Sequence, residues 1–170
     1  MKSRLLLLCA LLTLSSAAMS QSLYQQYIKA AKAGDAKAQV QVGIAYEKGE
    51  GVPKDMSQAV YWFEKAAEQG DVSEQGHVAY YYYNGIGVQK DLVKAAYWWR
   101  KAAEQGSAEG QHDLALCYYF GEGVPKDYTQ AFQWWSKAAE WEHGPRSTIW
   151  ADATIRALAP TRTCNWLPSG

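Results

Sequence analysis

Three stretches of the chain share one glycine-rich pattern: GEGVPKD at Gly49–Asp55, GIGVQKD at Gly85–Asp91 and GEGVPKD at Gly121–Asp127. Successive copies begin 36 residues apart, and aligning the chain with itself at this spacing gives three units: Asp35–Gly70, Asp71–Gly106 and Ser107–Glu142. The aligned positions recur as columns: Tyr46, Tyr82 and Tyr118; Ala59, Ala95 and Ala131; Trp62, Trp98 and Trp134. A period of this length is typical of a repeat architecture.

Each unit has the pattern of two short amphipathic helices. The first unit shows it by the helical spacing of its small and apolar residues: Ala38, Val42, Ala45 and Tyr46 for one helix, and Ala59, Trp62, Phe63, Ala66 and Ala67 for the next. Helices of about 13 residues are marginal in isolation, so each hairpin has to bury its apolar face against its neighbour. The pattern therefore predicts an all-α solenoid.

The glycine-rich loops are predicted to be structural. Gly49 follows the last periodic residue of a helix, where a left-handed cap suits glycine, and Gly51 allows the chain to reverse. Pro53 stops the first helix, and Asp55 stands where the second needs an N-cap, as do Asp91 and Asp127 in the other units. A phosphate cradle would need a preceding strand or a following Gly-Lys-Ser/Thr, and the sequence has neither.

Both ends of the array are predicted to be half repeats. Leu23–Gly34 aligns with a second helix, so 21–34 is expected to form an N-terminal capping helix. Ser147–Ala159 aligns with a first helix, and 143–170 is expected to form a C-terminal capping helix and tail around the repeats at 35–142. With six helices in the hairpins, this predicts eight helices in all.

The first twenty residues have the pattern of a secretory signal peptide. Lys2 and Arg4 precede an apolar run, Leu5–Leu14, and small residues follow. The apolar run is shorter than the ~20 residues that span a bilayer. We therefore expect cleavage after Ser20, no membrane insertion after signal removal, and a periplasmic or secreted protein.

The order of residues in each unit resembles the Sel-one-like repeat, a relative of the tetratricopeptide repeat. The first unit carries the resemblance at fourteen positions: Ala38, Val42, Gly43, Tyr46, Gly49, Gly51, Val52, Asp55, Ala59, Trp62, Lys65, Ala66, Ala67 and Gly70. The resemblance implies a right-handed α-α superhelix of three 36-residue helical hairpins with half-repeat caps. It also implies that a protein or peptide partner binds in the concave groove, as in an envelope adaptor or an immunity-type inhibitor of a secreted effector.

No catalytic or cofactor-binding constellation is present in the sequence. Gly-x-Ser-x-Gly, Cys-x-x-Cys, His-Glu-x-x-His and Ser-x-x-Lys are all missing, so we expect a non-enzymatic protein without a cofactor. An envelope hydrolase acting on β-lactams or peptidoglycan stays open as the alternative, because some cysteine-rich members of the family have been linked to that chemistry. His77, His112 and His143 are too far apart for the short paired spacings of metal ligands.

The charge distribution and the cysteines support expectations about partners and about a disulfide. Lys and Arg are not clustered, which argues against a nucleic-acid partner, and we expect a monomer. Cys117 and Cys164 are the cysteines that remain after signal removal, and an oxidising compartment favours a disulfide between them.

The predicted partner-binding surface is a stripe on the first helices, which we call the groove stripe. Its members lie at i, i+4, i+7 and i+11 in each unit: Lys37, Gln41, Ile44 and Lys48; Ser73, His77, Tyr80 and Asn84; Glu109, Asp113, Leu116 and Phe120. No column of the stripe repeats a residue, although the structural columns nearly always do. In tetratricopeptide-like solenoids the first helices line the concave side. The alternative is that these are ordinary solvent positions.

Overall fold

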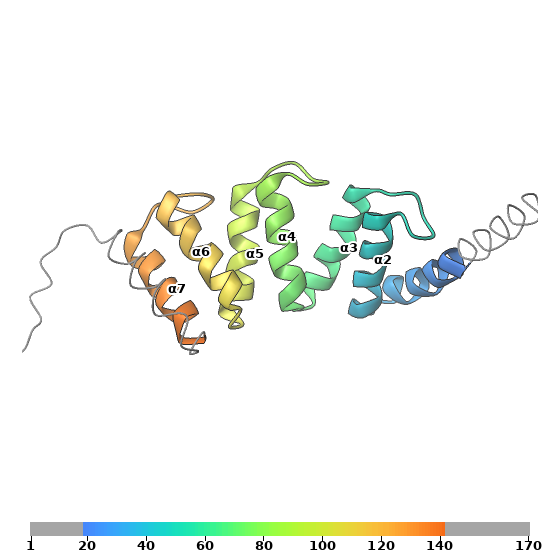
Figure 1. The fold of residues 1–170 in the computed structure, drawn as a ribbon, viewed down its shortest axis with the longest axis horizontal. Coiled ribbons are helices and arrows are strands. Elements are labelled where there is room, and N and C mark those ends of the chain that lie inside the picture. Colours follow the sequence, from blue (N-terminus) through green and yellow to red (C-terminus); the bar gives the residue numbers. More distant parts are fainter. Residues whose placement is uncertain (1–18, 142–170) are drawn as a thin grey trace, which may run out of the picture.

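The computed structural model describes residues 19–141, and within that range it contains seven helices and no strand. A helix at 19–32 comes first; the others are α2 (Ala36–Lys48), α3 (Met56–Glu68), α4 (Val72–Asn84), α5 (Leu92–Glu104), α6 (Ala108–Phe120) and α7 (Tyr128–Trp141). They follow one another along a single axis in chain order (Figure 1). The prediction of an all-α helical repeat solenoid is confirmed. The eighth helix expected at Ser147–Ala159 lies outside the described residues.

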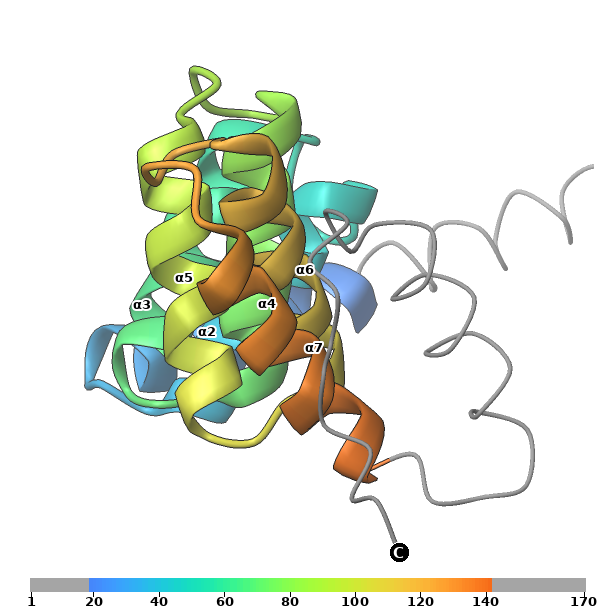
Figure 2. The same cartoon turned by 90° about the vertical axis from the view of Figure 1, so that its left-hand side faces the viewer.

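Each helix from α2 to α7 packs mainly against the helix before it and the helix after it in the chain. Seen along the array, α3 and α5 lie on one side, and α2, α4 and α6 lie on the other (Figure 2). Contact limited to neighbours is the property that defines a solenoid. The first helices of the three repeats therefore form one row, and the second helices α3 and α5 form another.

The predicted helix caps are confirmed. The carboxylate of Asp55 accepts hydrogen bonds from the backbone N–H groups of Ser57 and Gln58, at 2.9 and 3.1 Å. Asp91 and Asp127 cap α5 and α7 in the same way. At the other end of the first helices, three glycines adopt the left-handed conformation: Gly49, Gly85 and Gly121, with φ of 78°, 71° and 77°.

The second glycine of each loop joins one repeat to the preceding second helix. A Cβ atom at Gly87, where φ is +71°, would lie 2.5 Å from the carbonyl oxygen of Met56. Gly51 and Gly123 face Ser20 and Leu92 in the same way, and these three partners are themselves 36 residues apart. The sequence predicted a chain reversal at these glycines, but not this close approach between repeats.

The core consists of two clusters of buried residues that run along the array. The larger joins α3, α4, α5 and α6 around Trp98, Trp99 and Leu114. The smaller cluster joins the helix at 19–32 to α2 and α3 through Ala31, Val42 and other residues. Alanines are fully buried in both helices of a repeat, and their small size lets neighbouring helices approach closely.

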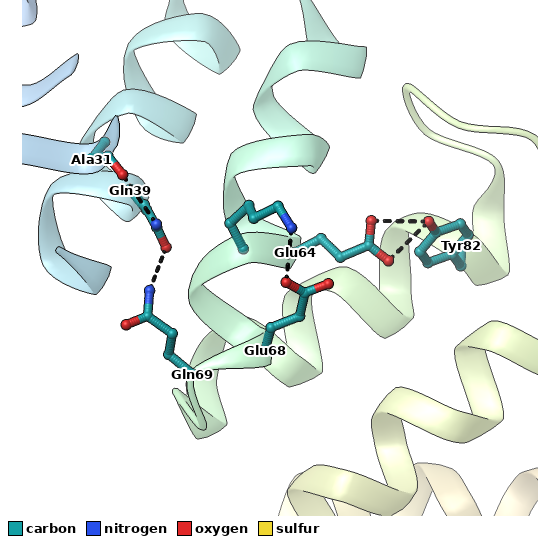
Figure 3. Close-up of polar contacts among 7 residues, drawn as sticks. Ala31, Gln39, Glu64, Glu68, Gln69 and Tyr82 are labelled. Atoms are coloured by element: carbon teal, nitrogen blue, oxygen red, sulfur yellow. Dashed lines mark hydrogen bonds and ion pairs between the residues drawn. The ribbon is translucent and has the colours of Figure 1, made fainter. Parts of the chain in front are cut away.

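A column of buried glutamines ties three successive helices together. In the first repeat, Gln39 donates through Nε2 to the carbonyl oxygen of Ala31 at 3.2 Å, and its Oε1 accepts from Gln69 Nε2 at 2.7 Å (Figure 3). Gln75 repeats both bonds, to Ala67 and from Gln105. The hydrophobic pattern of the repeats does not indicate this column, although its glutamines lie 36 residues apart in the sequence.

In the third repeat, one hydrogen bond of the glutamine column is missing. Gln111 donates to the carbonyl oxygen of Ala103, but its buried Oε1 has no hydrogen-bond partner among the described residues. The donor in the first two repeats is Gln69 or Gln105, and the equivalent position in the third is Trp141. A buried acceptor without a partner costs about 1–3 kcal/mol.

A second set of polar contacts links the tyrosine column to the preceding helix. Tyr82 donates its hydroxyl to Glu64 at 3.1 Å (Figure 3). One repeat later, Arg100 donates to the hydroxyl of Tyr118 at 2.7 Å. Glu64 and Arg100 occupy equivalent positions of the first and second repeats. A tyrosine hydroxyl can bond to either an acidic or a basic side chain, because it can both donate and accept a hydrogen bond.

Candidate functional site

The structure places the groove stripe on α2, α4 and α6, which lie in one row (Figure 2). Most of its side chains are exposed: Lys37, Gln41, Lys48, Ser73, His77, Tyr80, Asn84, Glu109 and Phe120. Asp113, Leu116 and Ile44 are half-buried. The twelve positions therefore form one accessible face of the row.

The four apolar residues of the stripe, Ile44, Tyr80, Leu116 and Phe120, differ in exposure. Ile44 packs against the larger core cluster, and Leu116 is half-buried. Tyr80 and Phe120 are 55% and 59% exposed. The accessible apolar content of the stripe is therefore concentrated in two aromatic rings.

The four consecutive tyrosines of α4, Tyr80–Tyr83, divide between core and surface. Tyr82 is buried, Tyr81 and Tyr83 are half-buried, and Tyr80 is exposed. Tyr81 stacks on the ring of Phe63 with 5.9 Å between centroids, and its hydroxyl donates to Glu47 at 3.3 Å. The run thus holds α4 against its neighbours while leaving one ring free of the core.

His77 lies among carboxylates that come from three different repeats. Its Nδ1 is 3.4 Å from Glu74 Oε2 on the same helix. The hydrogen bond to Glu74 raises the pKa of His77; burial opposes this change, and the charges of Glu74, Glu109 and Glu47 add to it. Carboxylates of α2, α4 and α6 therefore act on the same part of the surface.

Glu74 is an unexpected residue at its position. Its side chain is only 8% exposed, and the equivalent positions of the other repeats hold Ala38 and Gly110. A Cβ atom at Gly110 would lie 2.8 Å from the Cβ of Ala102, so the column calls for small residues. Glu74 is visible in the sequence as a departure from the repeat pattern, but its contact with His77 is seen only in the structure.

The other reactive side chains form no chemical site in the described part of the chain. Among residues 19–141, no group of three His, Cys, Asp or Glu residues could hold a metal ion. His112 contacts the adjacent Asp113 at 3.0 Å. Cys117 is buried with a free thiol, and burial raises its pKa to about 12, so it is a poor nucleophile at neutral pH.

Two of the sequence predictions fall partly outside residues 19–141. Cys164 and His143 are not among the described residues, so the Cys117–Cys164 disulfide stays a prediction. No described helix is long and apolar enough to cross a membrane. A shallow pocket lined by Tyr82, Lys90 and Lys94 lies at the α4–α5 loop, away from the groove stripe.

The family model of the Sel1 repeat matches the chain at residues 36–71, 75–107 and 108–140. These matches cover more than half of the chain and coincide with the three hairpins described above. The chain is a helical repeat solenoid, and it belongs to the Sel1 repeat family. Sel1 repeat proteins generally mediate protein–protein interactions.

Solved structures show the same architecture. A Sel1 repeat protein from Oxalobacter formigenes is 38% identical, with a TM-score of 0.71 over 79% of this chain and 55% of that one. A protective antigen present in uropathogenic Escherichia coli strains, displaying an SLR fold, is 31% identical, with a TM-score of 0.58 over 78% of this chain and 35% of that one. The chain thus spans about half and about a third of their lengths.

A more distant match shows the fold alone. Cysteine rich protein B of Helicobacter pylori is 23% identical, with a TM-score of 0.55 over 78% of this chain and 95% of that one. None of the curated proteins compared with the chain matches it.

Proposed function

We propose that this protein is a non-enzymatic, exported binding module that holds a partner protein against the groove stripe. The single observation that carries the proposal is the pair of exposed rings, Tyr80 and Phe120, on one face of a row whose columns do not repeat. Exposed aromatic residues are enriched at protein interfaces, and a few such anchors supply most of the binding energy. The signal-peptide pattern of residues 1–20 supports a place in the periplasm or outside the cell.

Within this class, the partner is either an envelope assembly or a secreted effector that the protein inhibits. Both roles use the same surface, because each needs a rigid face with a few anchoring side chains. The solenoid supplies that rigidity, since its helices are fixed by caps, glutamine bonds and buried alanines.

Affinity capture with matched variants tests the proposal. The purified protein is used to capture partners from envelope extract, alongside the variants Tyr80→Ala/Phe120→Ala and Tyr61→Ala/Tyr97→Ala. Tyr61 and Tyr97 are 48% and 51% exposed on α3 and α5, so the second variant removes similar rings from the other row. We expect the first variant to lose the captured protein and the second to retain it, with both close to the wild-type melting temperature.

Two results would overturn the proposal. Full capture by Tyr80→Ala/Phe120→Ala would show that the groove stripe is not the site. Turnover of nitrocefin, or release of muropeptides, by the purified protein would favour the hydrolase alternative, provided that a substitution in the protein abolishes the activity.

A further inference from the structure

We infer that the groove stripe at α4 and α6 binds a basic segment of the partner, with a Lys or Arg side chain placed between Tyr80 and the carboxylates of Glu74 and Glu109. This inference rests on the proposed function, because it names the chemistry of the partner at the same surface. Three observations on this face support it: the separation of charge between α4 and α6 on one side and α5 on the other, the carboxylate buried at Glu74, and the absence of a Lys or Arg over the ring of Tyr80 within residues 19–141.

The first observation is the separation of charge between the first helices α4 and α6 and the second helix α5 that lies between them in the chain. Together, α4 and α6 contain the carboxylates Glu74, Glu109 and Asp113 and neither Lys nor Arg. The second helix between them, α5, contains three basic residues and one acidic residue: Lys94, Arg100, Lys101 and Glu104. The chain has no net charge overall, so α4 and α6 are negative because the charges are segregated in this part of the array, whereas α2 carries Lys37 and Lys48 against Glu47. A negative face selects a positive partner and steers its approach.

The second observation is the position of the carboxylate at Glu74. A buried carboxylate costs desolvation energy unless it is well paired, and the bond that pairs Glu74 with His77 is long, at 3.4 Å. The equivalent residues Ala38 and Gly110 show that the repeat itself needs no acid there. Residues that depart from the rules of a fold are often functional. A cation from a partner would give the Glu74 carboxylate a positive partner in addition to His77.

The third observation is the ring of Tyr80. On the other row, Tyr61 and Tyr97 each lie beneath a lysine of the same helix, with Nζ 5.9 and 5.6 Å from the ring centroids. Within residues 19–141, no Lys or Arg lies over the ring of Tyr80 in this way. Tyr80 follows His77 by three residues, which places both on the same helix face. An exposed ring on the same helix face as His77, on which the carboxylates of Glu74 and Glu109 act, can take an external Lys or Arg by a cation–π contact while those carboxylates supply an ion pair.

The same geometry makes binding depend on pH. The charged groups that act on His77 are Glu74 on α4, Glu109 on α6 and Glu47 on α2. When His77 is protonated, it satisfies these carboxylates and adds a positive charge to the face. A basic segment therefore binds more weakly below the pKa of His77 than above it, where the ring is neutral.

Fluorescence anisotropy with labelled oligopeptides of known charge tests the inference. The probes are hexa-arginine and, as the opposite charge, hexaglutamate, each titrated with the full protein at low and high salt. The groove variant is Glu74→Gln/Glu109→Gln, which keeps side-chain size. The control variant is Glu68→Gln/Glu104→Gln, which removes two exposed carboxylates from α3 and α5.

The wild type is expected to bind hexa-arginine in preference to hexaglutamate, with an affinity that falls as salt is added. The groove variant should weaken hexa-arginine binding by about tenfold or more, as the loss of a charge pair at an interface does, and the control variant should not. Between about pH 8 and about pH 5.5 the wild type should lose affinity, and His77→Gln should flatten that dependence. Equal weakening by both glutamine variants would overturn the inference, because binding would then follow net charge and not this face.

The failure of this inference can be distinguished from the failure of the proposed function. If Tyr80→Ala/Phe120→Ala loses the natural partner but Glu74→Gln/Glu109→Gln retains it fully, the stripe binds the partner without a basic contact. In that case the inference is wrong and the proposed function stands. If Tyr80→Ala/Phe120→Ala retains the partner, the site itself is wrong and both fail.

Discussion

Replacing Gly87 with alanine tests whether the loop glycines join the repeats. The matched control is Gly49→Ala, because Gly49 has a similar backbone conformation, with φ of +78° against +71° at Gly87. An added Cβ at Gly49 would lie 3.4 Å from its nearest neighbours, atoms of Lys54, which is an ordinary contact distance. At Gly87 the same atom would lie 2.5 Å from the carbonyl oxygen of Met56 and 2.6 Å from its carbonyl carbon. The two substitutions therefore share the conformational cost and differ in the contact.

The expected magnitudes follow from these distances. A left-handed conformation costs a non-glycine residue about 1–2 kcal/mol, and both variants carry this cost. Overpacking adds about 1–3 kcal/mol where the neighbour cannot move aside, and the backbone of Met56 is held at the start of α3. We expect Gly49→Ala to lower the free energy of unfolding by about 1–2 kcal/mol and Gly87→Ala by about 2–5 kcal/mol.

Urea denaturation followed by circular dichroism measures both values, and thermal melts give a second reading. Each kcal/mol should lower the Tm by about 2–4 °C for a chain of this size. Equal destabilisation by the two alanines would refute the reasoning, because the close approach to Met56 would then have no energetic consequence.

Three further predictions concern the glutamine column, His77 and Cys117. Gln75→Leu removes two buried hydrogen bonds and should lower the free energy of unfolding by about 1–3 kcal/mol. Gln111→Leu removes one bond together with an unpaired buried acceptor, so it should be nearly neutral in the same urea assay; an equal loss in both variants would contradict this account. The pKa of His77 is raised in the folded state, so its bond to Glu74 contributes stability that is complete below the usual pKa of about 6.5 and is lost as pH rises through the raised value. The stability advantage of wild type over His77→Gln should therefore be larger at about pH 5.5 than at about pH 8.5, and a pH-independent difference would argue against the pair. The thiol of Cys117, reduced and 2% exposed, should react with a thiol reagent only after the protein unfolds, and rapid reaction in the native state would show that the site opens.

Much of the fold could be predicted from the sequence because the residues that begin and end the helices recur in all three repeats. Helix caps depend on residues within four positions of each other, so Asp55 and Gly49 could be assigned from spacing alone. The contact between each loop and the preceding second helix could not be predicted in this way. Gly87 and Met56 are 31 residues apart, and the local sequence around neither residue indicates that they meet. The same holds for Gln39 and Gln69, whose bond joins the second turn of α2 to the end of α3.

The candidate site was only partly predictable for a related reason. Helical spacing identifies which residues share a face, and it placed Tyr80 and Phe120 on the exposed side. It does not show how deeply a residue at the edge of that face is packed, and Ile44 is half-buried and packs against the larger core cluster. The association of His77 with Glu109 and Glu47 depends on how three repeats stack, which periodicity within one repeat does not specify.

Departures from the repeat pattern at buried positions are of two kinds, and they have different causes. Gln111 lacks a donor at the last described repeat, where Trp141 replaces the glutamine of the earlier repeats, so an end effect is sufficient to explain it. Glu74 departs in the middle of the array, where α4 has α3 on one side and α5 on the other, as any interior first helix does. Its position in the middle of the array means that an end effect cannot explain the buried acid. The fold does not need an acid at this position either, since the other two repeats have alanine or glycine there. What distinguishes this repeat is that Glu74 contacts His77 and that the exposed ring of Tyr80 lies on the same helix face as His77. The central repeat is therefore where a partner would find both charge and aromatic surface in one place.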